Sequence, residues 1–101
     1  MSPRFAYLYF MRDDPERIRE AVGRHVEHWQ HQRLSGYLGG PFEDRSGGLI
    51  TFHAEAAEPA RRLVDDDPFA REGLIEASWL KQWTASALGP DDSRVLDRTR
   101  E

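Results

Sequence analysis

Residues 5–11, Phe5-Ala6-Tyr7-Leu8-Tyr9-Phe10-Met11 (FAYLYFM), form a continuous apolar and aromatic run without a charged side chain. Side chains of a β-strand point alternately to the two faces of its sheet, and here both alternating sets are apolar or aromatic. Such a run predicts a strand that is buried on both faces. Each face of the sheet that holds this strand therefore needs a cover.

The rest of the chain alternates between helix and strand signals. The stretch Asp13-Asp14-Pro15-Glu16 offers an N-cap, a proline for the first helical turn and an acid near the positive end of the helix dipole. Pro59 fits only the first turn of a second helix, and a Gly-rich turn separates two short strands. The predicted order is strand 5–11, helix 15–33, strands 36–41 and 48–53, helix 56–67 and strand 74–83.

This βαββαβ order predicts an α+β domain of the ferredoxin-like type, with an antiparallel sheet and both helices on one face. The domain is predicted over residues 1–84, followed by a polar tail, residues 85–101, that is mobile or docks on a partner subunit. The helices would leave the other face uncovered, and the first strand offers an apolar set to each face: Phe5, Tyr7, Tyr9 and Met11 to one, and Ala6, Leu8 and Phe10 to the other. An exposed patch of that size predicts a homodimer joined sheet to sheet. The alternative is that the tail folds back over its own sheet.

Composition excludes several classes of function. The net charge is −4, and the 14 Lys and Arg residues are scattered among 18 acids, so no basic stripe for nucleic acid is expected. Because the chain has no cysteine, disulfides, thiolate metal sites and cysteine nucleophiles are excluded. Neither a signal peptide nor the ~20 apolar residues of a spanning helix are evident, so a cytoplasmic protein without a membrane partner is expected.

Helical periodicity orients the histidines of the first helix. At roughly 100° per residue, His25 lies inside the apolar stripe, His28 lies on its shoulder, and His31 points toward solvent. Only His25 is therefore predicted to face the sheet. The core side is predicted to consist of Ile18, Val22, Val26 and Trp29.

The same count orients the three aspartates of Val64-Asp65-Asp66-Asp67-Pro68-Phe69. Asp65 and Asp66 point away from the apolar side of the second helix, whereas Asp67 points inward at its end. The negative end of the helix dipole and desolvation both disfavour a carboxylate there. Asp67 is therefore expected to need a partner, and His25 on the first helix is the predicted one.

An Asp–His pair at a half-buried site suits general acid and base chemistry, because the carboxylate fixes the imidazole tautomer and supports its protonated form. The alternative is a structural pair that only joins two helices. No metal site is predicted, since the order His25-Val26-Glu27-His28 departs from the zincin pattern and no third ligand is placed. The glycine-rich turns do not run from strand into helix, so they are not predicted to bind phosphate.

The chain resembles the YciI-like family (YCII-related domain), of the dimeric α+β barrel group, over residues 4–83. The resemblance implies a ferredoxin-like protomer that pairs through its sheet, with a pocket near the interface. It also implies that the family's proposed catalytic pair maps to His25 and Asp67. The matching motifs are the FAYLYF strand, Arg24-His25-Val26-Glu27-His28-Trp29, Gly36-Tyr37-Leu38-Gly39-Gly40-Pro41, Asp44-Arg45-Ser46-Gly47-Gly48, Asp67-Pro68-Phe69 with Gly73-Leu74, and a last strand ending in Trp83.

Two hypotheses follow for the function. In the first, the protein is a cofactor-free enzyme of lyase, isomerase or dehalogenase type that acts on a small cyclic or aromatic molecule. His25 would move the proton, Asp67 would orient it, and Arg45 would hold an anionic group. In the second, it is a small-molecule-binding or accessory module whose His–Asp pair is structural. Related barrels also include oxygenases that need neither metal nor flavin. The expected apolar walls are Tyr7, Tyr9, Phe42 and Phe69.

Overall fold

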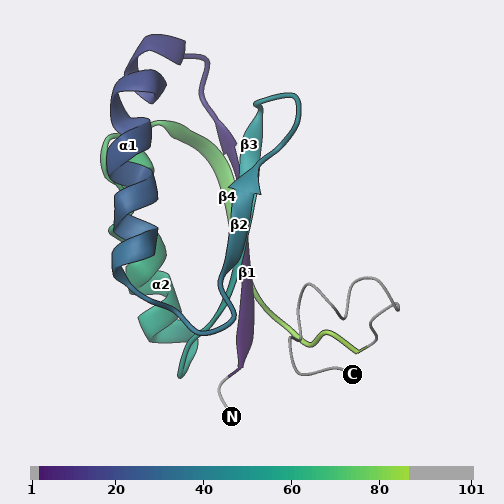
Figure 1. Ribbon diagram of the computed structural model, residues 1–101. Helices are drawn as coiled ribbons and strands as arrows, with labels where there is room; N and C mark the ends of the chain where they lie inside the picture. The colour runs from purple at the N-terminus through teal and green to yellow at the C-terminus, as the bar shows by residue number, and fades with distance from the viewer. Residues whose placement is uncertain (1–2, 87–101) are drawn as a thin grey trace, which may run out of the picture.

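The structure is a computed structural model that describes residues 3–86. It confirms the predicted βαββαβ order and adds one short helix before the last strand (Figure 1). The elements are β1 (Arg4–Met11), α1 (Pro15–His31), β2 (Leu38–Pro41), β3 (Gly47–His53), α2 (Ala57–Asp65), α3 (Pro68–Arg71) and β4 (Ile75–Trp83).

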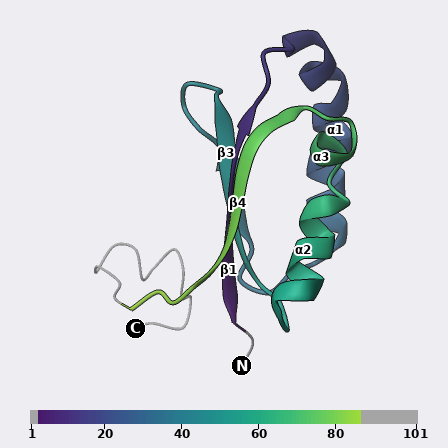
Figure 2. The same cartoon turned by 180° about the vertical axis from the view of Figure 1, so that it is seen from behind.

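The four strands form one antiparallel sheet in the order β2-β3-β1-β4. The apolar strand β1 therefore lies between β3 and β4, as its composition requires. Figures 1 and 2, seen from opposite sides, show the helices together on one face of the sheet. This arrangement confirms the predicted α+β fold of the ferredoxin-like type.

The main core lies between the sheet and the helices. Phe5, Tyr7 and Tyr9 of β1 point into it and are at most 4% exposed, as the alternation of the strand predicts. Trp29 of α1 packs against Tyr7 and Phe52, with ring centroids 6.2 and 5.5 Å away. The other buried apolar residues are Ala21, Ile50, Ala60, Val64, Phe69 and Leu74.

The predicted core side of α1 is partly wrong. Val22 and Val26 are 43% and 44% exposed, whereas Ala21, His25 and Trp29 are buried. The apolar stripe assigns the core to the most hydrophobic side chains, but the helix is rotated so that a histidine faces inward. This rotation occurs because His25 has a buried partner, described below, and it leaves the two valines at the rim of a cavity.

The end of the predicted helix 56–67 is also wrong. Helix α2 ends at Asp65, and a new helix, α3, begins at Pro68. Proline disfavours the α conformation in the residue before it but suits the first position of a helix. Asp67 accordingly has an extended backbone (φ −60°, ψ 129°) and caps α3. Its carboxylate therefore meets the positive end of a helix instead of the negative end that the sequence suggested.

The tail that was predicted to be mobile or to dock on a partner subunit comprises residues 85–101. Of these, residues 87–101 lie outside the described residues. None of the helices within residues 3–86 has the length and apolar character needed to cross a membrane.

Close contact between β1 and β3 depends on Gly47. A methyl group added there would lie 1.9 Å from the backbone oxygen of Tyr9, whereas one added at Gly40 of β2 would meet nothing within 4 Å. We expect Gly47→Ala to lower the free energy of unfolding by about 1–3 kcal/mol because backbone must shift to relieve the overlap. Gly40→Ala, the matched control, should stay within about 0.5 kcal/mol of the parent protein in urea denaturation. Equal stabilities for the two variants would contradict this account of the strand pairing.

Candidate active site

A buried carboxylate, Asp67, lies at the meeting point of α1 and α3. It is fully buried, and His25 beside it is 8% exposed. The His25 Nδ1 atom lies 2.9 Å from each Asp67 carboxylate oxygen. Trp29 Nε1 donates to Oδ2, and the backbone N–H of Phe69 donates to Oδ1, each at 2.9 Å. Four hydrogen-bonding contacts from three residues therefore hold this carboxylate.

These contacts fix the hydrogen on the imidazole ring. The indole and backbone N–H groups can only donate, so both Asp67 oxygens act as acceptors, as the two oxygens of a carboxylate do. His25 Nδ1 must then carry a hydrogen in either charge state of the ring. In the neutral imidazole the second nitrogen, Nε2, consequently has a free electron pair and can accept a proton.

The short sequence Asp67-Pro68-Phe69 provides two contacts to the His25 imidazole: a carboxylate at Nδ1 and an aromatic ring on its face. Pro68 starts α3 and turns Asp67 toward the core, and Phe69, one residue later, stacks on the His25 ring with centroids 4.0 Å apart and planes 10° apart. The end of α3 is tied to α1 because Arg17 Nη2 donates to the Glu72 carbonyl oxygen at 3.0 Å. The ring of His25 is thus held between the carboxylate and an aromatic face.

Two buried tyrosines of β1 lie near the pair. Burial raises the pKa of Tyr9 well above its ordinary value, and the negative charge of Asp67 raises it further. Burial and then the charge of Asp67 act in the same direction on the pKa of Tyr7. Both phenols therefore remain protonated at neutral pH. The Tyr9 hydroxyl lies 3.4 Å from His25 Nε2.

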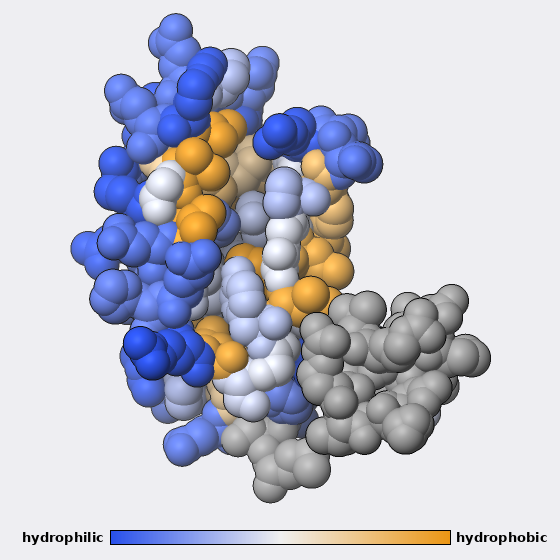
Figure 3. Space-filling model, viewed as in Figure 1, coloured by the Kyte–Doolittle hydropathy of each residue, from blue (hydrophilic) through white to orange (hydrophobic). Residues whose placement is uncertain are grey.

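His25 and Tyr9 line a cavity of about 370 Å³ between α1 and the β2–β3 hairpin. This volume is within the range of ordinary small-molecule sites. Figure 3 shows apolar surface along the side of α1 that borders the sheet. Val22 and Val26 account for the exposed apolar positions of α1 at this rim. The other lining residues are Met11, Ile18, Gln30, Tyr37, Gly39, Gly40, Pro41, Arg45, Gly47, Ile50 and Phe69.

The sequence-predicted site residues do not all meet in this cavity. Tyr9, Phe69 and Arg45 line it, together with His25. Tyr7 is buried beneath it and stacks on Tyr9 at 5.1 Å. Phe42 contacts Phe10 on the opposite face of the sheet and is not among the residues that line this cavity. The cause is strand pairing, because the Phe42 N–H donates to the Gly47 carbonyl oxygen at 2.8 Å and Gly47 is also the register partner of Phe10.

Arg45 is placed by the tight turn between β2 and β3. The Asp44 carboxylate accepts from the Ser46 backbone N–H at 3.0 Å and from its hydroxyl at 2.7 Å. Arg45 adopts a left-handed conformation (φ 66°), which is uncommon outside glycine. The turn thereby brings a guanidinium group to the exposed rim of the cavity, where it could contact an anionic group.

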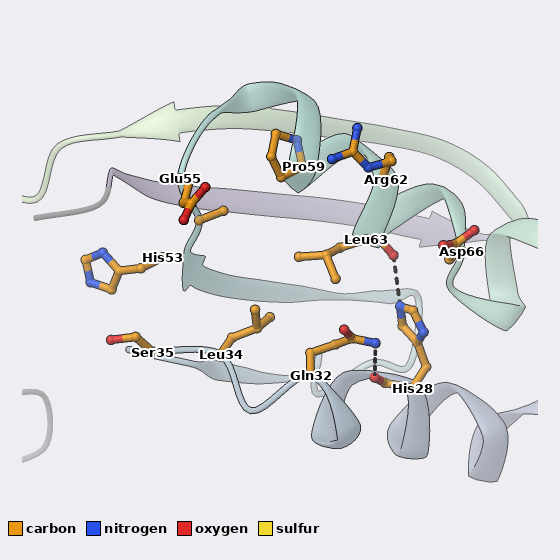
Figure 4. Close-up of a pocket in the computed structure, with 11 residues that line it drawn as sticks. His28, Gln32, Leu34, Ser35, His53, Glu55, Pro59, Arg62, Leu63 and Asp66 are labelled. Atoms are coloured by element: carbon orange, nitrogen blue, oxygen red, sulfur yellow. Dashed lines mark hydrogen bonds between the residues drawn. The ribbon is translucent and has the colours of Figure 1, made fainter.

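A second and larger cavity, of about 490 Å³, lies between the end of α1 and α2 (Figure 4). Its two histidines already have partners, since His28 Nε2 donates to the Leu63 carbonyl oxygen at 2.9 Å and His53 Nε2 lies 3.1 Å from Arg4 Nη2. Arg62 at its rim lies 3.6 Å from Glu58. This cavity is open and lacks a buried titratable group, so the smaller cavity is the better candidate site.

Sequence reasoning missed the role of Trp29. The helix count treats it as a core residue, yet its indole N–H holds the same carboxylate oxygen as His25. A signal was available, because a buried tryptophan normally finds an acceptor for its N–H and Trp29 lies one turn after His25. Among residues 3–86, no group of three His, Asp or Glu side chains is arranged to hold a metal ion.

The family described as the YCII-related domain matches residues 5–84. A structure of 5-chloro-2-hydroxyhydroquinone dehydrochlorinase from Burkholderia phenoliruptrix AC1100, in complex with 2,5-dihydroxybenzoquinone, is 19% identical with a TM-score of 0.73. The match covers 82% of this chain and 95% of that chain.

A second similar structure is a mutant of SnoaB, a cofactor-independent oxygenase from Streptomyces nogalater, with 16% identity and a TM-score of 0.50. That match covers 86% of this chain and 95% of the oxygenase. At these identities the two structures show a shared fold. A comparison with curated proteins gives no significant match.

The raised tyrosine pKa values predict a loss of stability at alkaline pH. Unfolded tyrosines ionise near pH 10, whereas Tyr7 and Tyr9 keep their protons in the folded state. Above about pH 10 the unfolded chain therefore binds fewer protons, and the free energy of unfolding should fall by about 1.4 kcal/mol per pH unit for each buried tyrosine. Tyr7→Phe and Tyr9→Phe should each reduce this slope in urea denaturation between about pH 9 and 11. Unchanged slopes in both variants would show that the phenols ionise normally in the folded protein.

Proposed function

Because the chain belongs to the YCII-related domain family, we propose that it is an acid–base enzyme acting on a small cyclic or aromatic molecule without a cofactor. The reaction would be of the lyase, isomerase or dehalogenase type. The observation that carries this proposal is the His25–Asp67 pair, which adjoins a cavity of about 370 Å³. The pair supplies a general base, and the cavity supplies room for a ring.

His25 takes the proton in this proposal. Its Nδ1–H group stays hydrogen-bonded to Asp67, and the electron pair on its Nε2 atom removes a proton from the bound molecule. The imidazolium that forms is stabilised by the ionised carboxylate 2.9 Å away. The proton can then return to another atom of the substrate or pass to a leaving group. Asp67 does not change its protonation state; it orients the ring and stabilises the positive charge.

The residues that line the cavity are suited to a planar substrate. Phe69, Tyr37 and Ile50 provide apolar contacts, and Gly39 and Gly40 lack side chains that would fill the space. Arg45 and Gln30 place polar groups at the rim. The dehydrochlorinase of similar fold acts on a substituted hydroquinone and is bound there to a hydroxylated quinone, which supports rings of this size as a substrate class.

The competing hypothesis is a binding or accessory module in which the pair is structural. It is favoured by the number of donors on Asp67, since a carboxylate bonded by Trp29 and Phe69 would stabilise the junction of α1 and α3 without any chemistry. The two hypotheses differ in what happens to turnover when the pair is altered.

The test uses 5-chloro-2-hydroxyhydroquinone, monitored by chloride release, together with thermal melting. His25→Ala and Asp67→Asn should each reduce turnover by about 10²–10⁴-fold, the usual range for loss of general acid–base catalysis. His28→Asn is the matched control, because His28 also lies on α1 but outside the proposed site. It should retain turnover. No turnover by the parent protein on this or related chlorinated hydroquinones, with only stability lost in the variants, would favour the accessory module.

The open face of the sheet supports a homodimer as the proposed assembly. Strand register places Leu8 of β1 beside Leu49 of β3 and Trp79 of β4. Leu49 is 41% exposed and Trp79 is 48% exposed, on the face away from the helices. An apolar row of this kind is expected to be covered by another protein surface, and a second copy presents the same row.

We expect the parent protein to have the mass of two 11.7 kDa chains in solution. Trp79→Glu should give single chains, since the paired faces would have to bury two unpaired carboxylates. Val22→Glu is the control, because Val22 is similarly exposed but lies on the helix side. Light scattering after size-exclusion chromatography measures the masses. A monomeric parent protein would refute the proposed assembly.

A further inference from the structure

A hydroxyl group lies next to the proton-accepting nitrogen of His25. Tyr9 projects from the middle of β1 toward α1, and its hydroxyl oxygen is 3.4 Å from Nε2. Gly48, its register partner on β3, makes this position possible, because a methyl group there would lie 2.4 Å from the same oxygen. Tyr9 is 4% exposed and lines the same cavity as His25.

The direction of the Tyr9–His25 hydrogen bond follows from the contacts of Asp67. Since Nδ1 carries the hydrogen that faces Asp67, Nε2 of the neutral ring is an acceptor. Burial keeps the Tyr9 phenol protonated by raising its pKa. Tyr9 is therefore the donor. At 3.4 Å the bond is longer than a typical O–H donor contact, so another oxygen can compete for the same hydrogen.

Resting on the function proposed above, we propose that the Tyr9 hydroxyl donates to His25 Nε2 in the empty site and to an oxygen of the bound substrate in the occupied site. The substrate must then carry this oxygen close to the hydrogen that His25 removes. Phenols, enols and ketones with an acidic neighbouring C–H meet this requirement. Tyr9 thereby becomes a specificity-determining contact in addition to part of an aromatic wall.

The proton and electron balance of this step is simple. A substrate O–H or C–H bond breaks, and an N–H bond forms at Nε2. The electron pair left by the proton remains on the substrate and resides largely on the oxygen that accepts from Tyr9. A donor aimed at developing negative charge stabilises it most strongly in a site from which water is excluded. No oxidant, reductant or metal takes part in the step.

The first part of the test reads the empty site by NMR of ¹⁵N-histidine-labelled protein. Tyr9→Phe should move the Nε2 resonance of neutral His25 toward the position of a nitrogen that accepts no hydrogen bond and leave the Nδ1–H resonance on Asp67 in place. Tyr7→Phe is the matched control, because Tyr7 is the neighbouring buried tyrosine and is not hydrogen-bonded to His25. It should leave both resonances unchanged. An Nε2 resonance that is the same in Tyr9→Phe and the parent protein overturns the proposed donor role.

The second part measures the dissociation constant of 2,5-dihydroxybenzoquinone by calorimetry at neutral pH. Tyr9→Phe should weaken binding by about 10- to 100-fold, the effect of losing a hydrogen bond to a charged oxygen. Tyr7→Phe should bind within about 3-fold of the parent protein. Equal affinity in Tyr9→Phe and the parent overturns the substrate contact, whereas the proposed function still stands if His25→Ala abolishes turnover. Full turnover in His25→Ala refutes the proposed function itself.

Discussion

The fully buried carboxylate of Asp67 is the constraint on which the site depends. Removing a charge from water is costly unless the protein replaces the lost hydrogen bonds. Here the replacements come from His25 and Trp29 of α1 and from the backbone of Phe69 in α3. Each donor is fixed in turn by packing, so α1 cannot rotate and α3 cannot shift without leaving the charge unsatisfied. The same contacts that stabilise this junction also set the tautomer of His25.

Local sequence signals explain the predictions that are correct, and the buried carboxylate explains one that is not. The order of elements follows from apolar runs, proline and glycine. Helical periodicity also predicts the inward direction of Asp67, but the structure achieves that direction in another way, because Asp67 lies beyond the end of α2 and caps α3 with an extended backbone. The family assignment is confirmed by a match over residues 5–84. The prediction for Val22 and Val26 is wrong because a periodicity count depends on hydrophobicity alone and gives no weight to the buried hydrogen bond from His25 of the same helix to Asp67 of another segment. The helix that ends at Asp65 was extended too far, because Pro68 was not recognised as the start of a new one.

Contacts between distant segments explain what the sequence could not predict. The stacking of Phe69 on His25 and the indole bond of Trp29 to Asp67 depend on the crossing of α1 and α3. That crossing is set by the whole core, which no local pattern specifies. Likewise, the direction of Phe42 depends on its pairing with Gly47, which places it on the same face as Phe10. Spacing predicted which residues share an element and not which of them share a cavity.

Strand register links the two faces of the sheet. Tyr9 points to the candidate site, while its neighbours Leu8 and Phe10 point to the open face. A slip of one residue would exchange these sets, placing a phenol on the open face and apolar side chains beside His25. The close approach of Gly47 and Gly48 to Tyr9 opposes that slip, since no other residue type fits against β1 there without displacing it. The close approach of the β3 glycines to β1 therefore fixes the strand register. Because one register sets both faces of the sheet, the candidate site and the apolar open face depend on the same contact.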